Sequence, residues 1–297
     1  MKKMNVAILG SGNIGTDLLV KTIRSPYLEN VLFIGRRLDS PGMKKASSLG
    51  INISDLSIGA IQNDPDSVDL VFDATSAIDH KKHWPILQDL GKKVIDMTPS
   101  GIGKMCIPAI NINDCLNNKN INMVTCGGQA SIPLAHTIGQ THENVDYIEV
   151  VSSIASRSAG PATRINLDEY IETTEKGIHM FSGCKSQKAI LILNPARPDV
   201  DMQTTVFAHV KEPNMESLEN AVKDMVKRIQ SYVPGYELIV SPILDNDRII
   251  IMVRVRGLGD YLPKYAGNMD IINCAAIKMA EEFHLNNKGD EINADHN

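Results

Sequence analysis

The sequence has few aromatic residues, no long apolar run and no large excess of charge of one sign. Phe, Trp and Tyr make up 4% of its 297 residues. No apolar run approaches the about 18 residues that a membrane-spanning helix needs, and no signal-peptide pattern precedes the first apolar segment, so we expect no membrane partner. Lys and Arg (30) against Asp and Glu (35) give a formal net charge of −5, which argues against a nucleic-acid-binding surface.

Cysteine is also scarce, with five residues spread along the chain and no C-x-x-C pair. An odd number at wide spacing argues against a disulfide framework and a zinc site, so we expect no metal and a reducing, cytoplasmic compartment. Hydrophobic residues nevertheless make up 43% of the chain, enough for a full core. The cysteines are Cys106, Cys115, Cys126, Cys184 and Cys274.

In the first half of the chain, strand-length apolar segments alternate with helix-length amphipathic stretches. This alternation is typical of an α/β domain with a doubly wound parallel sheet, which we place at residues 1–128. The expected strands are 5–9, 31–34, 68–73, 93–96 and 122–125, and the expected helices are 15–25, 43–50 and 81–90.

The second half has consecutive strands with few helices between them, which predicts an α+β domain with a largely antiparallel sheet at 129–269. A terminal helix, 270–284, is expected to join the first domain, and the polar tail 285–297 is expected to be frayed and flexible. The expected strands are 147–154, 188–193, 205–210, 236–240 and 248–255, and the expected helices are 166–176 and 215–232.

Directly after the first strand, residues 10–15 read G-S-G-N-I-G and open a helix. This G-x-G-x-x-G pattern allows a tight turn, close approach of a pyrophosphate and close helix–strand packing. It predicts a dinucleotide site of the Rossmann type; the structural alternative is an ordinary tight turn.

After the second strand come Arg36, Arg37 and Asp39. The arginines suit the 2′-phosphate of NADP, and Asp39 suits the ribose of NAD, so both cofactors stay open.

Cys126 follows the fifth strand, precedes a helix and is followed by two glycines. A helix N-terminus stabilises a thiolate, and the amides of Gly127 and Gly128 can bind an oxyanion. We expect Pro133 in the first turn of this helix. A dinucleotide and a cysteine nucleophile together predict an aldehyde dehydrogenase, in which a thiohemiacetal loses hydride and leaves an enzyme thioester.

Between residues 6 and about 280 the chain resembles the acylating acetaldehyde dehydrogenases, the family that partners 4-hydroxy-2-oxovalerate aldolase in meta-cleavage pathways of aromatic catabolism. The resemblance implies that acetaldehyde or another short aldehyde, coenzyme A and NAD⁺ give an acyl-CoA and NADH. It also implies a homodimer, which we expect to form through the sheet of the second domain and to bind two aldolase subunits. The motifs that carry it lie at residues 10–18, 71–77, 123–130, 158–164, 192–196 and 265–271.

The resemblance implies that Cys126 is the nucleophile that forms the acyl thioester. It further implies that Ser11, Gly12, Asn13 and Ile14 hold the pyrophosphate. The rest of the NAD site, near the nicotinamide, would be Ser158, Ala159, Gly160, Pro161, Ala162, Thr163, Arg164, Ile165, Asn166 and Asn268. The segment 158–164 reads as a small-residue loop, or as an ordinary turn into the next helix, and Asn268 also fits a helix cap.

Two positions depart from the family pattern: Ala162 stands where glycine is usual, and Thr204 stands where an aspartate is thought to assist the reaction. We consider His209, on the strand that carries Thr204, as a base for a thiol, and we expect His136 on a helix surface.

Two alternative functions remain. One is a phosphate-dependent semialdehyde dehydrogenase of the same fold. The other is a nucleotide-binding subunit of the aldolase with little turnover.

Overall fold

The computed structural model describes residues 2–294, which divide into two compact units. Within this range the first unit comprises residues 2–123 and 273–294, and the second comprises 124–272. The chain leaves the first unit between Met123 and Val124, five residues before the boundary expected after residue 128. Cys126 therefore belongs to the second unit. None of the helices in the described residues is long and apolar enough to cross a membrane.

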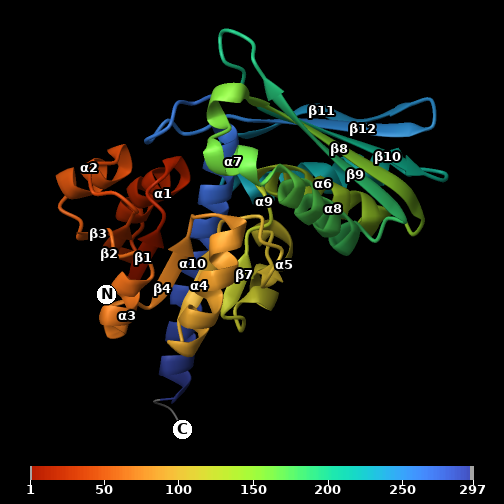
Figure 1. The fold of residues 1–297 in the computed structure, drawn as a ribbon. Helices are drawn as coiled ribbons and strands as arrows, with labels where there is room; N and C mark the ends of the chain where they lie inside the picture. The colour runs from red at the N-terminus through yellow and green to blue at the C-terminus, as the bar shows by residue number, and fades with distance from the viewer. Residues whose placement is uncertain (1, 295–297) are drawn as a thin grey trace. The chain divides into compact units, whose positions relative to one another are not determined.

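The first unit contains the predicted doubly wound parallel sheet (Figure 1), with strand order β3-β2-β1-β4-β5-β7-β6 and all pairings parallel. The two-residue strands β3 and β6 were not predicted, and the fifth predicted strand ends at residue 122 instead of 125. The strands are β1 (Met4–Leu9), β2 (Leu28–Ile34), β3 (Ile53–Ser54), β4 (Leu70–Asp73), β5 (Lys93–Asp96), β6 (Lys104–Met105) and β7 (Asn120–Asn122).

These strands read as near-continuous apolar runs because helices cover both faces of a parallel sheet. Ala7, Val71 and Val94, on neighbouring strands, are fully buried in one cluster, and Trp84 packs against it from α4. The helices are α1 (Asn13–Arg24), α2 (Pro41–Ser48), α3 (Gly59–Asn63), α4 (Ala77–Asp89) and α5 (Pro108–Cys115), with a 3-10 turn at Pro65–Ser67.

The long C-terminal helix α10 (Gly267–Ala294) returns to the first unit, as predicted. Phe283 is fully buried there, with Lys93 Nζ 4.4 Å from the centre of its ring. Asn273 Nδ2 donates to the buried carboxylate of Asp17, 2.8 Å away. The helix was expected to end at residue 284, but it continues to Ala294, and the fraying of the tail from residue 285 stays a prediction. Residues 295–297 of that predicted tail lie outside the described residues.

The second unit has a five-stranded sheet in the order β11-β12-β10-β8-β9 (Figure 1), in which β8 and β9 are parallel and the other pairs antiparallel. This confirms the largely antiparallel sheet. The strands are β8 (Val145–Ala155), β9 (Ser186–Asn194), β10 (Met202–Val210), β11 (Tyr236–Asp245) and β12 (Arg248–Val255), and the longer helices are α6 (Cys126–Thr141), α8 (Leu167–Ser182) and α9 (Met215–Gln230).

Helices α6, α8 and α9 cover one face of this sheet (Figure 1). Side chains along β10 alternate accordingly, since successive residues of a strand point to opposite faces. Thr204, Val206 and Ala208 are buried, whereas Thr205 and Phe207 are partly exposed. The sheet therefore has a helix-covered face and an open face.

Candidate active site

The glycine-rich turn after β1 is built as its sequence predicts. Gly10 has φ +119°, and a Cβ at this position would lie 2.5 Å from the carbonyl oxygen of Ala74. A Cβ on Gly15 would lie 1.9 Å from the carbonyl oxygen of Gly10. At Gly12, in contrast, no atom of the described residues would come within 4 Å of an added Cβ. The first and third glycines are thus needed for packing, and the second leaves the turn open to a ligand.

The N-terminus of α1 fits a pyrophosphate. Gly12 is its N-cap residue and provides no side-chain cap, and the first turn has no acidic residue. Ser11, Asn13 and Ile14 are partly or fully exposed. Backbone amides at an exposed helix N-terminus, together with the helix dipole, favour phosphate groups. These are the residues to which the family resemblance assigned the pyrophosphate.

At the end of β2, the Arg37 guanidinium binds the carboxylate of Asp39 through two hydrogen bonds, Nε–Oδ1 at 2.9 Å and Nη2–Oδ2 at 2.7 Å. This contact lowers the pKa of Asp39. Arg36 is exposed beside the pair. Ser40, which caps α2, lies 3.3 Å from the hydroxyl of Ser11 in the glycine turn. Charges suited to a ribose or its phosphate therefore border the glycine turn.

Cys126 is the first residue of α6 and follows a strained turn. Val124 is buried and has φ +61°, a conformation that β-branched residues rarely adopt. Thr125 is the N-cap residue, and its Oγ1 accepts a hydrogen bond of 2.8 Å from the amide of Gly128. Pro133 lies well inside the helix instead of in its first turn, because the helix already begins at Cys126. The turn leaves the Cys126 side chain partly exposed at a helix N-terminus.

A tyrosine that the sequence did not single out contacts this cysteine. The hydroxyl oxygen of Tyr170, on α8, is 3.7 Å from Cys126 Sγ. Burial raises the pKa of the Cys126 thiol, while the contact with Tyr170 and the backbone amides of Gly127 and Cys126 oppose that rise. The net effect is a raised pKa, because burial outweighs the hydrogen-bond donors that favour the thiolate.

Thr204, at the position of the family aspartate, is fully buried on the helix-covered face of β10. Its Oγ1 lies 2.9 Å from Oγ of Ser152, the cross-strand neighbour on β8. Ser152 Oγ is in turn 3.2 Å from where a Cβ of Gly127 would be. Two uncharged hydroxyls thus adjoin the cysteine turn at this point.

His209 does not belong to this group of residues, so the hypothesis that it activates the thiol is wrong for this structure. It pairs with Tyr147 on β8, five positions from the Thr204–Ser152 pair, or roughly 17 Å along the strand. It also lies on the open face, where its Nδ1 is 3.7 Å from the carboxylate of Asp247. His136 is half-buried, with Nδ1 2.8 Å from the carbonyl oxygen of Phe181.

The segment predicted to line the nicotinamide, which the sequence offered as a small-residue loop or as a turn into the next helix, has regular structure. It consists of a 3-10 turn (η2, Ser156–Ser158) and a short helix, α7 (Pro161–Ile165). Arg164 holds this segment together, because its guanidinium donates to the carbonyl oxygens of Ala159 and Ser156. A Cβ added to Gly160 would have no neighbour within 4 Å in the part of the chain that the structure describes. The segment is thus hydrogen-bonded within itself and has an open glycine.

Asn268 and Asn166 are both buried, with 2% and 3% of their surfaces exposed. Asn268 lies inside the first turn of α10, which begins at Gly267, and is not its cap as one interpretation proposed. Its Oδ1 has no hydrogen-bond partner among the described residues. A buried acceptor without a partner is costly and suits a ligand that donates to it.

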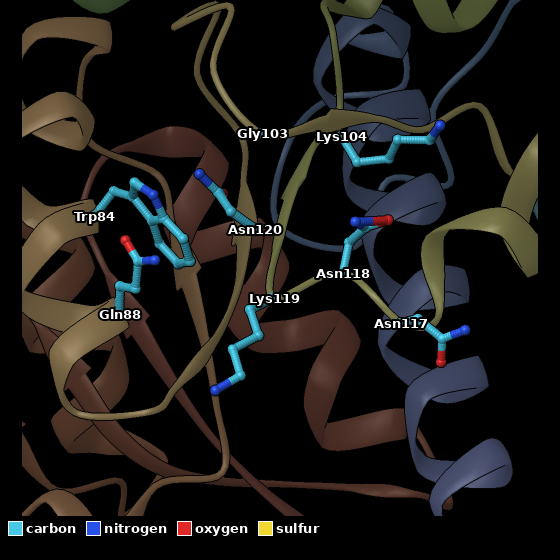
Figure 2. A pocket seen from close by; sticks show the side chains of 8 residues that line it. All are labelled: Trp84, Gln88, Gly103, Lys104, Asn117, Asn118, Lys119 and Asn120. Carbon is cyan, nitrogen blue, oxygen red and sulfur yellow. The ribbon is translucent and has the colours of Figure 1, made fainter.

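A separate surface pocket in the first unit (Figure 2) contains neither Cys126 nor any predicted cofactor-binding residue. Trp84 and Gln88 come from α4, and the other lining residues come from the segment around β6 and β7. Those residues are Gly103, Lys104, Asn117, Asn118, Lys119 and Asn120. We assign this pocket no part in the chemistry of Cys126.

Comparison with known proteins covers both units. Residues 5–101 match the family model of the semialdehyde dehydrogenase NAD-binding domain, and residues 126–263 match the model of the prokaryotic acetaldehyde dehydrogenase dimerisation domain. The structure is similar to aspartate semialdehyde dehydrogenase II from Vibrio cholerae, with a TM-score of 0.62 at 13% identity over 94% of this chain and 98% of that one. At that identity the similarity establishes the fold.

Several curated relatives are far more similar in sequence. The acetaldehyde dehydrogenase of Spirochaeta aurantia is 62% identical over 282 residues, which is 95% of this chain and 95% of that protein. The acetaldehyde dehydrogenase of Pectobacterium atrosepticum is 58% identical over 94% of this chain and 95% of that protein. That of Geobacillus stearothermophilus is 46% identical over 95% of this chain and 97% of that protein. With this sequence identity over nearly its whole length, the chain is an oxidoreductase that belongs to the acetaldehyde dehydrogenase family.

Proposed function

We propose that the enzyme is acylating: it converts acetaldehyde, coenzyme A and NAD⁺ into acetyl-CoA, NADH and a proton, with Cys126 as the nucleophile. The observation that carries this proposal is the position of Cys126, partly exposed at the N-terminus of α6 behind the strained residue Val124. A thiolate at a helix N-terminus adds readily to a carbonyl carbon.

Ser11, Gly12, Asn13 and Ile14 would hold the pyrophosphate of NAD, and the segment 158–166 with Asn268 would complete the cofactor site. The open turn at Gly12 and the buried Oδ1 of Asn268, which has no partner among the described residues, support this assignment. Bound NAD⁺ supplies the acceptor for a hydride. The chain's own residues hold it and present the substrate carbon from Cys126.

The cysteine chemistry proceeds in two halves. The Cys126 thiolate attacks the aldehyde carbon, a C–S bond forms, and the carbonyl π electrons move to oxygen. When the hydride leaves this carbon, the oxygen electrons re-form the carbonyl group and a thioester remains on Cys126. The thiolate of coenzyme A then attacks the thioester carbon, and Cys126 departs as a thiolate. Of the two amides expected to bind the oxyanions, that of Gly128 already donates to Thr125 Oγ1, so the amide of Gly127 is the candidate.

The test follows NADH formation by ultraviolet absorbance with acetaldehyde and NAD⁺, with coenzyme A or phosphate as acyl acceptor. We expect turnover that requires coenzyme A and is abolished in Cys126→Ala. The matched control is Cys184→Ala, since Cys184 is fully buried and precedes β9. Turnover with phosphate instead of coenzyme A would favour a semialdehyde-type reaction. Cofactor binding without turnover would favour a subunit that only binds nucleotides.

We further propose a cytoplasmic homodimer that pairs through the open face of the second-unit sheet and associates with a 4-hydroxy-2-oxovalerate aldolase in aromatic catabolism. The dimerisation-domain match over residues 126–263 supports the homodimer. The aldolase partner rests on the family resemblance. Co-elution of the two purified proteins in gel filtration tests it, and separate elution at micromolar concentrations of both would contradict it.

A further inference from the structure

The phenol of Tyr170 lies against the sulfur of Cys126. Its hydroxyl oxygen is 3.7 Å from Sγ, within hydrogen-bonding range for sulfur. A Cβ on Gly127 would lie 2.1 Å from that oxygen. The absence of a side chain at Gly127 therefore makes the space that the hydroxyl occupies.

Hydrogen bonds fix Tyr170 relative to the cysteine turn. Its carbonyl oxygen accepts a hydrogen bond of 2.7 Å from Thr174 Oγ1, which is 2.7 Å from Thr125 Oγ1. Thr125 is the N-cap residue of α6 and accepts from the amide of Gly128. A continuous chain of hydrogen bonds thus links the backbone of Tyr170 to the helix end that carries Cys126. Networks of this kind rigidify the segments that they join.

Tyr170 keeps its proton at neutral pH. Burial and the neighbouring Cys126 raise the pKa of Tyr170 well above its ordinary value. The phenol is therefore a hydrogen-bond donor and not a base for the thiol. The neighbouring side chain from β8, Ser152, and its partner from β10, Thr204, are uncharged. Among the described residues of the second unit, the side chain hydrogen-bonded to Cys126 Sγ is that of Tyr170.

We propose that Tyr170 is a catalytic residue whose hydroxyl donates a hydrogen bond to the sulfur of Cys126 and stabilises the thiolate. This role rests on the proposed function of Cys126 as the nucleophile. In the thiol state, the S–H group points to the phenol oxygen. On ionisation the S–H bond breaks, its electron pair stays on sulfur, the proton passes to water, and the phenol O–H turns to the sulfur. Tyr170 itself loses no proton.

Thiol ionisation can be measured without aldehyde or cofactor, from the pH dependence of alkylation by iodoacetamide, with the modified residue identified by mass spectrometry. In Tyr170→Phe we expect the pKa of Cys126 to rise by about one unit, because a donor to a charged sulfur is lost. Alkylation at neutral pH then slows about tenfold. The kcat/KM for acetaldehyde falls by a similar factor at neutral pH, and the deficit shrinks as the pH rises.

The matched control is Tyr236→Phe. Tyr236 is also buried, and its hydroxyl donates a hydrogen bond of 2.7 Å to the carbonyl oxygen of Ala130 on the same helix. This variant loses a buried hydrogen bond to Ala130, which lies one helical turn beyond Cys126 on α6. We expect the pKa of Cys126 to be unchanged in Tyr236→Phe.

An unchanged pKa of Cys126 in Tyr170→Phe, or an equal shift in Tyr236→Phe, overturns the role of Tyr170 while leaving Cys126 as the nucleophile. Full coenzyme A-dependent turnover in Cys126→Ala is a different failure, because it overturns the proposed function itself. If Tyr170→Phe does not fold by circular dichroism, Gly127→Ala tests the same contact from the other side. That variant should show the same rise in the pKa of Cys126, and an unchanged value overturns the proposal.

Discussion

A Cβ atom on Gly127 would lie 2.1 Å from the hydroxyl oxygen of Tyr170, and 3.2 Å from Ser152 Oγ. The first distance is far below any van der Waals contact, and the phenol is buried between α6 and α8, so it has little room to move. Glycine after the cysteine therefore has a packing reason: it admits the phenol to the side of the sulfur.

Gly127→Ala should consequently displace the phenol and damage both stability and activity. We expect the free energy of unfolding in urea to fall by about 1–3 kcal/mol, the usual cost of overpacking a core. We expect kcat/KM for acetaldehyde to fall at least about tenfold, because the sulfur loses a hydrogen-bond donor. Gly59→Ala is the control, since its added methyl group would meet no atom of the described residues within 4 Å. Equal behaviour of the two variants would contradict the packing argument.

A group of buried ionisable side chains lies at the ends of β4 and β5 in the first unit. The carboxylate of Asp73 is fully buried and lies 3.0 Å from Nδ1 of His80 and 2.9 Å from Nδ1 of His83, both on α4. Burial raises the pKa of Asp73, but the two imidazoles outweigh it and lower the value to about 2. Asp96 faces the other side of His80, and burial raises its pKa to about 6.

Asp73→Asn should destabilise the enzyme in a pH-dependent way. Because the folded-state pKa of Asp73 lies below the unfolded value of 3.8, its carboxylate stabilises the fold above that pH, and the stabilisation is lost as the pH falls toward 2. We expect a loss of about 2 kcal/mol at pH 7 in urea unfolding, shrinking below about pH 4. The control is Asp69→Asn, because the Asp69 carboxylate is exposed and accepts a hydrogen bond from the backbone amide of Asn5. We expect almost no loss of unfolding free energy in this variant. A pH-independent difference for Asp73→Asn would refute this account.

The parallel sheet was predictable because strands buried on both faces are apolar almost throughout. Residues 5–9 and 93–96 were predicted as strands, and β1 and β5 have nearly those bounds. The two-residue strands β3 and β6 have no such pattern, since too few positions are present to show a period. The helix α5 was also missed; its run of Ile and Asn has weak amphipathic periodicity, and Asn111 interrupts it with non-helical angles.

The candidate site was only partly predictable. Cys126 and the residues of the glycine turn lie in local sequence patterns that indicate their chemistry. Their roles in the reaction remain predictions. Tyr170 is 44 residues from Cys126 in sequence and carries no motif; the contact arises only from the packing of α8 on α6. Likewise, pairing of β8 and β10 brings Ser152 to Thr204, and strand register cannot be fixed from a single sequence.

Cofactor choice is predicted to depend on Arg36. Arg37 is bound to Asp39, whereas Arg36 is exposed at the end of β2, where a 2′-phosphate would lie in this fold. We expect Arg36→Ala to lower kcat/KM with NADP⁺ about tenfold and to leave that with NAD⁺ unchanged, because only the former carries the phosphate. Lys45→Ala, on the exposed side of α2, controls for the loss of one positive charge. Equal losses with both cofactors would show that Arg36 does not distinguish NADP⁺ from NAD⁺ by binding the 2′-phosphate.

The open face of the second-unit sheet presents an apolar strip. Thr205 on β10 lies between Val151 on β8 and Met252 on β12, and in the next row Phe207 lies between Ile250 on β12 and the one charged member, Glu149 on β8. All six side chains are partly exposed. Contiguous apolar surface on a sheet is typical of a protein–protein interface. Residues on the other face of the same strands are buried under helices, so a substitution on the open face can test association without disturbing the core.

Met252→Asp should therefore separate the dimer into folded monomers. A carboxylate at the centre of an apolar interface loses its hydration when two copies pair, and symmetry places two such charges close together, which costs several kcal/mol of binding free energy. We expect the wild-type enzyme to sediment as a dimer at micromolar concentration and Met252→Asp as a monomer with unchanged circular dichroism. Met180→Asp introduces the same charge at an exposed position of α8 and should remain a dimer. A dimeric Met252→Asp enzyme would place the interface elsewhere.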